Sequence, residues 1–403
     1  MYSCQDSFNQ TEIPNGENIF EKLEIPQLLE DEKDSLEHPF SKQELYDVVL
    51  SMKKNKTPGY DGLPIEFYIT FWSDICDMLL NSYNFSMSNG MLSQSQRNGI
   101  ITLLPKKGKD PLYIKNYRPI TLLTVDYKII AKCLANRLKK RMETLINPDQ
   151  SGFLKGRNIG ANIRLILDII EHTESNNLPG SIVLLDIEKA FDSVKHDFLL
   201  RVLKYFNFGD KFISWIKVIY SGRQSYVMNN GFLTERIAME RGIFQGCPLS
   251  PYLFLFVIEI MALSIRQDDK IAGICVNNQE VKISLLADDS VCFLDGSKTS
   301  LENLFDVLNA FGKYSGCKIN LTKSEAIWIG SKKGSTDTFP SVQGINWKIS
   351  HFKCLGVNFS LDIKDMFDLN YKVKLKGIEQ TLNCWRMRNL SLIGRICVIK
   401  TLV

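Results

Sequence analysis

Apolar and polar positions follow one another in the middle of the chain in the order strand, helix, hairpin, helix, hairpin, helix. Ser181–Ile187 (SIVLLDI) is a nearly continuous apolar run with an acid near its end, as expected of a buried central strand. Pro248–Ile265 predicts a long apolar helix, and Val281–Leu294 predicts a hairpin with ADDS at its tip. This order predicts an α+β fold in which an antiparallel sheet carries helices on one face.

Local signals place further elements around this centre. Ser41, with Glu44 three residues later, predicts the capped start of a helix. We expect either Asp192 or Ser193 to cap the helix after the central strand, and we expect a hairpin turn at Asn229–Gly231. The remaining predicted elements are helices at Ile65–Tyr83, Thr124–Leu145 and Leu301–Tyr314, and a strand at Ile100–Leu104.

Composition indicates a globular protein. The 403 residues, 44% hydrophobic and 23% charged, are enough for two or three subdomains around a large core. Ten cysteines form no C-x-x-C pair and only four histidines are present, which leaves little material for a zinc module or a histidine triad. We expect the thiols to be reduced. The longest apolar run, around Tyr252–Ile258, is too short to span a membrane, and no signal peptide is recognisable.

The formal net charge of +4 is unevenly distributed. Glu21–Glu37 is acidic and is expected to be a solvated lead-in, whereas Arg97–Arg141 and Lys372–Lys400 are basic. Each basic segment alone is typical of a solvated helix face. Together, on either side of a centre rich in carboxylates, they favour a polyanion bound across an acidic metal site.

The two adjacent aspartates in ADDS need a partner, because apolar runs flank them on both sides. Asp288 and Asp289 would point to opposite faces of a regular strand, but a tight turn can bring both to one edge, near Asp186. A plain solvated turn is the alternative, since Asp is a favoured turn residue. If the three carboxylates converge, their oxygens suit Mg²⁺, and two such ions predict phosphoryl transfer.

Several blocks surround these acids in a characteristic order, and together they resemble the reverse transcriptase domain of non-LTR retrotransposons of the LINE class. The resemblance extends from about Ser41 to the end of the chain. One departure is Leu286, where members often carry an aromatic residue two positions before the first aspartate of the pair. The matching blocks are TPGYDGLPIEFY, LLPKKGKDPLYIKNYRPITLL, DQSGFLKGRNIGANI, LLDIEKAFD, RGIFQGCPLSPYLF, LLADD, SGCKINLTKSEAIWIG, FKCLGVNF and LSLIGRICVIK.

The resemblance implies a right-hand polymerase that extends a primer 3′-hydroxyl with dNTPs along an RNA template, with DNA as a further template, using two Mg²⁺ ions or Mn²⁺ in their place. It implies an acidic lead-in over residues 1–40, fingers over 41–150, a palm over 151–370 and the start of a thumb over 371–403. The expected partners are an RNA template, a DNA primer or target and dNTPs, with no membrane. The family's endonuclease has no counterpart here and the thumb is short, so we expect a piece of a longer polyprotein.

The resemblance also implies roles for individual residues, with Asp186, Asp288 and Asp289 as the metal-binding triad. For each of the others, a packed or solvated side chain without chemistry is the alternative. The implied roles are phosphate binding for Lys106 and Arg118, exclusion of a ribose 2′-hydroxyl for Phe191, a helix start beneath the template base for Gln245 and Gly246, template contact for Arg157, primer-sugar contact for Phe352 and proton donation to pyrophosphate for Lys323.

Two other kinds of protein share these features. A group II intron maturase or a domesticated reverse transcriptase has the same palm, and flanking modules would distinguish it. A degenerate element remnant that binds nucleic acid without efficient polymerisation is the non-enzymatic alternative. The intact aspartates Asp186, Asp288 and Asp289 favour catalysis.

Overall fold

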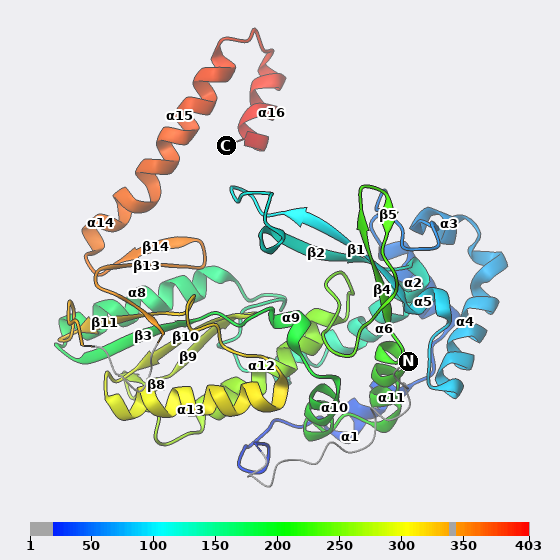
Figure 1. Cartoon of the computed structure of the whole chain (residues 1–403), viewed down its shortest axis with the longest axis horizontal. Helices are drawn as coiled ribbons and strands as arrows, with labels where there is room; N and C mark the ends of the chain where they lie inside the picture. Colours follow the sequence, from blue (N-terminus) through cyan, green and yellow to red (C-terminus); the bar gives the residue numbers. More distant parts are fainter. Residues whose placement is uncertain (1–18, 338–343, 403) are drawn as a thin grey trace. The chain divides into compact units, whose positions relative to one another are not determined.

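The computed structural model (Figure 1) describes residues 19–337 and 344–402. By its internal contacts the chain divides into two compact units. The first unit comprises Met1–Pro148, Glu188–Asp268 and Asp306–Lys318. The second unit comprises Asp149–Ile187, Asp269–Phe305 and Ile319–Val403. The three predicted metal-binding aspartates all belong to the second unit.

The first unit contains a five-stranded sheet in the order β2-β1-β4-β5, with β6 also paired to β4. Strands β1 and β2 are antiparallel, whereas β1 and β4 are parallel. Helix α12 is buried along nearly its whole length and packs on α6 and α10. The elements are α1 (Glu30–Glu37), α2 (Lys42–Ser51), α3 (Ile65–Thr70), α4 (Trp72–Asn89), α5 (Gln94–Arg97), β1 (Asn98–Pro105), η1 (Ile114–Asn116), β2 (Tyr117–Leu122), α6 (Val125–Lys139), α7 (Met142–Leu145), α9 (Ala190–Ser193), α10 (His196–Tyr205), α11 (Asp210–Tyr220), β4 (Gln224–Asn229), β5 (Phe232–Leu233), β6 (Ile237–Ala238) and α12 (Ser250–Arg266).

The second unit contains a five-stranded sheet in the order β12-β11-β3-β10-β9 and two separate hairpins, β7–β8 and β13–β14. Every pair in the sheet is antiparallel except β11 with β12. Helix α13 (Lys298–Ser315) runs from the second unit into the first. The other elements are α8 (Ile159–Ser175), β3 (Pro179–Leu185), β7 (Ile274–Val276), β8 (Gln279–Val281), β9 (Ile283–Leu286), β10 (Asp289–Leu294), β11 (Glu325–Gly330), β12 (Asn346–Lys348), β13 (His351–Cys354), β14 (Val357–Ser360), α14 (Ile363–Phe367), η3 (Asp368–Lys372), α15 (Val373–Arg386) and α16 (Leu392–Leu402).

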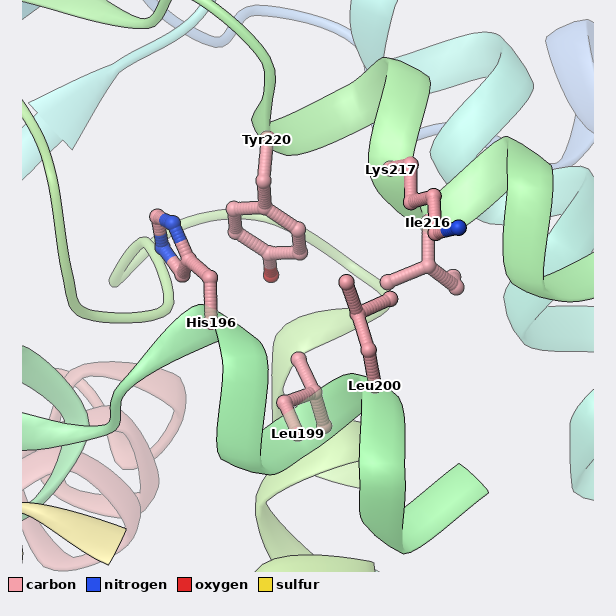
Figure 2. A pocket seen from close by; sticks show the side chains of 6 residues that line it. All are labelled: His196, Leu199, Leu200, Ile216, Lys217 and Tyr220. Atoms are coloured by element: carbon pink, nitrogen blue, oxygen red, sulfur yellow. The ribbon is translucent and has the colours of Figure 1, made fainter. Parts of the chain in front are cut away.

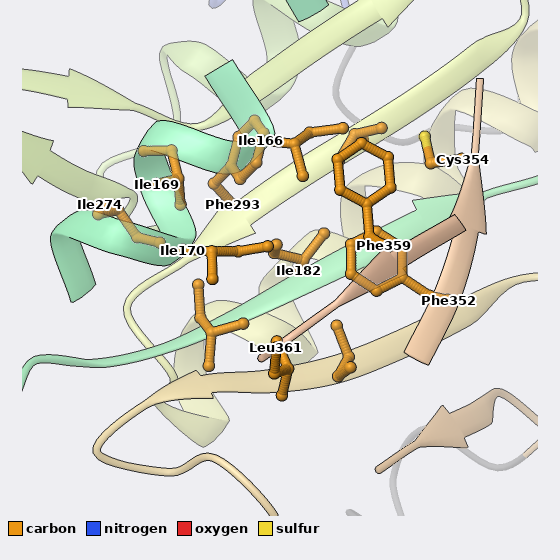
Figure 3. Close-up of a cluster of buried hydrophobic side chains, with 13 residues drawn as sticks. Ile166, Ile169, Ile170, Ile182, Ile274, Phe293, Phe352, Cys354, Phe359 and Leu361 are labelled. Carbon is orange, nitrogen blue, oxygen red and sulfur yellow. The ribbon is translucent and has the colours of Figure 1, made fainter. Parts of the chain in front are cut away.

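A cluster of buried apolar side chains covers one face of the sheet in the second unit (Figure 3). Register places Ile182 of β3 between Phe293 of β10 and Ile327 of β11, so that side chains two residues apart on each strand share this face. Helix α8 and the β13–β14 hairpin contribute the facing side chains. Fully burying one such side chain stabilises the fold by roughly 1.5–3 kcal/mol. The predicted α+β class with a largely antiparallel sheet is confirmed.

Two of the local predictions are confirmed in detail. Ser41 precedes α2, and its hydroxyl accepts a hydrogen bond from the Glu44 N–H at 3.1 Å. The predicted hairpin turn pairs Asn229 with Phe232, which leaves Asn230 (φ 50°) and Gly231 (φ 82°) in the turn. Both have the positive φ that a tight hairpin turn of this kind requires.

Two predicted helices are wrong in part. Ile65–Tyr83 is divided at Phe71 into α3 and α4, and both pieces pack against α2. Thr124–Leu145 is divided between α6 and α7 at Arg141, whose guanidinium is 3.0 Å from Glu32 of α1. In both cases packing against another helix favours two shorter helices over one straight helix.

The predicted cap at Asp192 or Ser193 is also wrong. Asp192 lies inside the short helix α9, which Lys189 precedes with a φ of 47°, and α10 begins after Lys195. The Ser193 hydroxyl donates to the Glu188 carbonyl at 2.7 Å and therefore does not cap α10.

Within the described residues, no helix has the length and apolar character that crossing a membrane requires. The nine cysteines of this part of the chain are free thiols, most of them buried.

Candidate active site

Sheet register brings the three predicted metal-binding aspartates to one edge of the second unit. Strand β10 lies between β3 and β9, and Ser290 pairs with Leu185. Asp289 and Asp186 are each one residue beyond that pair, so they lie side by side where the two strands end. Asp288 occupies the turn that joins β9 to β10, because Asp289 pairs back with Leu286. Three carboxylates from segments about 100 residues apart therefore meet at one edge.

The electrostatics of this edge are unfavourable without a cation. The pKa of Asp288 and that of Asp289 are both raised, first because neighbouring protein atoms remove water from the carboxyl groups, although both side chains still reach solvent. Repulsion adds to the effect, since Asp186 raises the pKa of both residues and Asp288 raises that of Asp289. A positive ion would relieve this repulsion.

The turn Asn320–Ser324 fixes the backbone of Asp186. The Asn320 N–H donates to the Asp186 carbonyl at 2.7 Å, and the Asp186 N–H donates to the Ser324 hydroxyl at 3.1 Å. Lys323, in the same turn, places its ammonium group 3.5 Å from a carboxylate oxygen of Asp186. Asn320 and Ser324 were not predicted as site residues, and the turn-forming composition of NLTKS is the sequence signal for them.

The donor set of this edge suits a hard divalent cation. In the part of the chain that the structure describes, no three His, Cys, Asp or Glu side chains are already arranged around a metal position. The three aspartates nevertheless supply oxygen ligands only, their charges repel one another, and the Lys323 ammonium already neutralises part of that charge. The residues present therefore fit Mg²⁺ or Mn²⁺.

The β13–β14 hairpin lies near Asp289. Burial raises the pKa of the Cys354 thiol to about 12, and the negative charge of Asp289 contributes to the increase. Leu355 (φ 51°) and Gly356 (φ 79°) form the two-residue turn of this hairpin. The hairpin matches the block FKCLG that the sequence analysis assigned to primer contact.

Phe352, the residue predicted to contact the primer sugar, is placed elsewhere. Its side chain is 4% exposed and its ring stacks on Phe359, with the ring centroids 5.0 Å apart, inside the core of Figure 3. A buried ring does not reach a sugar, so this placement corrects the direct contact.

The predicted phosphate-binding residues lie on the β1–β2 hairpin of the first unit. Leu104 pairs with Arg118, and the Lys106 N–H donates to the Asn116 carbonyl at 2.8 Å, which continues the ladder past the end of β1. Lys106 is two residues beyond Leu104, so the backbone directs Lys106 and Arg118 to the same face of the hairpin. Arg118 is exposed.

Gln245 and Gly246 precede α12 and do not begin it, because the helix starts at Ser250. The Gln245 carbonyl accepts a hydrogen bond from the Thr121 N–H at 3.2 Å. Gly246 has a φ of 109°, and a Cβ at this position would lie 2.8 Å from the Thr121 carbonyl oxygen. This close approach of two backbones requires glycine. The predicted helix start at these two residues is therefore wrong, and they form a tight loop on β2.

Two further predicted residues, Phe191 and Arg157, make intramolecular contacts. The Phe191 ring is half-buried and stacks on Phe254 of α12, with the ring centroids 4.4 Å apart. The Arg157 guanidinium donates to the Gln150 carbonyl at 2.8 Å, so it stabilises its own loop. Neither contact tests a role in sugar selection or template binding, and both roles stay predictions.

A buried arginine that no sequence motif indicated contacts Phe244, the residue before Gln245. Arg223 is 2% exposed, and its guanidinium lies 4.4 Å from the ring centroids of both Tyr127 and Phe244. One of its nitrogens donates to the Gln96 carbonyl at 2.6 Å. This cation–π contact links Arg223 to the ring of Phe244, the residue before Gln245.

A small pocket in the first unit is lined mainly by apolar side chains (Figure 2). His196 lies at one end of it, with its Nε2 atom 2.8 Å from the Gly242 carbonyl oxygen, and burial lowers the pKa of its imidazole. The pocket is lined by His196, Leu199, Leu200, Ile216, Lys217 and Tyr220. It has no carboxylate lining it, so it is distinct from the edge that carries the three aspartates.

Comparison with known proteins agrees with the geometry of this edge. Residues 104–359, more than half of the chain, match the family described as reverse transcriptase (RNA-dependent DNA polymerase). The chain is 34% identical over 389 residues to the transposon TX1 uncharacterized 149 kDa protein of Xenopus laevis, with 94% of this chain and 29% of the relative covered. It is 24% identical to the RNA-directed DNA polymerase from mobile element jockey of Drosophila melanogaster, with 90% of this chain and 41% of the relative covered.

The chain thus spans less than half the length of these relatives. Among solved structures, the chain is similar to apo telomerase from Candida Tropicalis truncated from the C-terminal domain, with a TM-score of 0.46 and 13% sequence identity. The superposed region covers 76% of this chain and 62% of the telomerase chain. The match over residues 104–359 includes the strands and turns that carry Asp186, Asp288 and Asp289. The chain therefore belongs to the reverse transcriptase family, in the LINE-type retrotransposon group to which its relatives TX1 and jockey point.

Proposed function

We propose that this chain is the catalytic part of an RNA-directed DNA polymerase that extends a primer 3′-hydroxyl with dNTPs. The observation that carries the proposal is the meeting of Asp186, Asp288 and Asp289 at one sheet edge of the second unit. Family membership and the name of the jockey relative support it. RNA template, DNA primer or target and dNTPs are the partners that this activity requires.

Reverse transcriptases generally use divalent metal ions, and the three aspartates would hold two of them here, as Mg²⁺ or Mn²⁺. When bound, such ions supply activation of an attacking hydroxyl and stabilisation of the leaving phosphate oxygen. The chain contributes the fixed position of Asp186, which the turn Asn320–Ser324 holds through two backbone hydrogen bonds. Lys323, whose ammonium group lies 3.5 Å from Asp186, would donate a proton to pyrophosphate as it leaves.

Other residues would bind the nucleotide and the template. Lys106 and Arg118, on one face of the β1–β2 hairpin, would hold the triphosphate, Arg through its planar fork and Lys as a point charge. The Gln245–Gly246 loop would lie against the paired base, and Phe191 against the sugar. In this assignment residues 41–150 are fingers, 151–370 palm and 371–403 the start of a thumb, after a lead-in over 1–40.

Primer extension tests this function directly. The folded protein is incubated with an RNA template, an annealed DNA primer, dNTPs and Mg²⁺, and Asp186→Asn serves as the matched inactive control. Extension of the primer by the wild-type chain and not by the variant is expected. Template binding without any extension would overturn the proposal and identify a nucleic-acid-binding remnant.

A further inference from the structure

The residue before the aspartate pair has an unfavourable backbone conformation. Ala287 has a φ of 58°, in the left-handed region that residues with a Cβ rarely adopt. Such a conformation is strained and persists only where surrounding contacts hold it. Ala287 directly precedes Asp288 in the turn, so its backbone conformation affects the direction in which Asp288 leaves it.

A single side chain binds both backbone groups of Ala287. The Gln150 Oε1 atom accepts a hydrogen bond from the Ala287 N–H at 2.8 Å, and the Gln150 amide nitrogen donates to the Ala287 carbonyl at 3.4 Å. The same Oε1 accepts from the Gly152 N–H at 2.7 Å, and the Gln150 residue is 1% exposed. A buried amide with these partners is held in one orientation.

The backbone around Gln150 is attached to the same hairpin. The Leu285 N–H donates to the Asp149 carbonyl at 2.9 Å, and the Ser151 N–H donates to the Leu285 carbonyl at 2.8 Å. A Cβ at Gly152 would lie 2.4 Å from the Ala287 nitrogen, so only glycine allows this approach. Gln150 therefore reaches Ala287 from a segment that is fixed to β9.

We propose that Gln150 is a positioning residue that holds the Ala287 turn and thereby sets Asp288 and Asp289 for binding divalent cations. Without its amide, the repulsion among the three carboxylates would act on a turn that can relax to an ordinary φ. Removing a group that orients metal ligands typically weakens metal binding by about 10–100-fold. The cation part of this inference rests on the proposed function, whereas the hold on Ala287 does not.

The test compares Gln150→Ala with Asn370→Ala. Asn370 is a matched control because its side chain binds one residue in the same two-sided way, accepting from the Asn358 N–H at 2.9 Å and donating to the Asn358 carbonyl at 2.7 Å. Three quantities are measured in each folded variant: hydrogen exchange of the Ala287 amide by mass spectrometry, binding of Mn²⁺ alone by electron paramagnetic resonance, and the Mg²⁺ concentration that half-saturates primer extension.

In Gln150→Ala, the Ala287 amide hydrogen is expected to exchange faster. The Mn²⁺ concentration for half-saturated binding and the Mg²⁺ concentration for half-saturated primer extension should both rise about tenfold. Asn370→Ala should lose stability and leave both metal titrations unchanged. Adding Ala287→Gly to Gln150→Ala should lower the metal requirement again, because glycine adopts a positive φ without strain. Unchanged exchange and Mn²⁺ binding in Gln150→Ala, or no recovery in the double variant, would overturn the inference.

These measurements separate the two proposals. Exchange and Mn²⁺ binding do not depend on polymerisation, so a wild-type chain that binds Mn²⁺ but extends no primer would overturn the proposed function alone.

Discussion

Replacing Asp289 with Asn should abolish primer extension and yet make the fold more stable. Loss of water around its carboxyl group and the charges of Asp288 and Asp186 raise the pKa of Asp289 above its ordinary value of 3.8. A raised pKa in the folded state means that folding disfavours the ionised carboxylate. The destabilisation is fully present above the raised pKa and disappears as the pH falls below it toward the unfolded value.

The solvent exposure of Asp289 sets the size of this change in the free energy of unfolding. Asp289 reaches solvent, where interactions between charges contribute about 0.2–1 kcal/mol. We therefore expect Asp289→Asn to raise the free energy of unfolding by about 0.5–1 kcal/mol at neutral pH, low salt and without divalent metal. Adding Mg²⁺ should stabilise the wild-type chain more than the variant and reduce the difference.

Urea denaturation at pH 7 and near pH 4, with and without Mg²⁺, measures these changes. Asp192→Asn is the control, because loss of water also raises the pKa of Asp192 while the nearby charge of Lys189 lowers it. Asp192→Asn should change stability less than Asp289→Asn. An Asp289→Asn variant that is less stable than wild type at neutral pH, or whose gain persists in acid, would refute the repulsion argument.

Three further outcomes are expected. Asp186→Asn should reduce primer extension by at least about a thousandfold, whereas Asp192→Asn should be far milder; equal losses would remove the distinction between them. Phe191→Val should raise ribonucleotide incorporation relative to deoxynucleotide incorporation, at a cost in stability from the cavity it opens; an unchanged ratio in the folded variant would make Phe191 a packing residue only. Binding of primer and template should weaken steeply as salt rises, and Lys106→Ala with Arg118→Ala should make the slope shallower; a slope that stays the same in the double variant would exclude phosphate contact by these two residues.

Local sequence pattern alone was enough to predict several structural features of this protein. The apolar run before Asp186 and the hairpin around Asp288 and Asp289 were predicted as a strand end and a turn, and the structure has both. The cap at Ser41 and the turn at Asn230 were also predicted. These features depend on residues within about four positions of one another, so the sequence carries them directly.

Only the tertiary structure decided which distant residues support the site. Gln150 binds Ala287, Asn320 and Ser324 bind Asp186, and the Phe352 ring lies in the core although its block suggested primer contact. The helix breaks at Phe71 and Arg141 likewise follow from packing against other helices, which periodicity does not reveal.

These distant residues meet because of the order of the strands in the sheet. The order β12-β11-β3-β10-β9 brings segments more than 100 residues apart to one sheet edge, and the free energy of those pairings comes from burial across the whole sheet. From a single sequence, the apolar runs on both sides of Asp288 and Asp289 predict that the two carboxylates need a partner. The folded sheet decides that Asp186 is beside them and that Gln150 holds their turn.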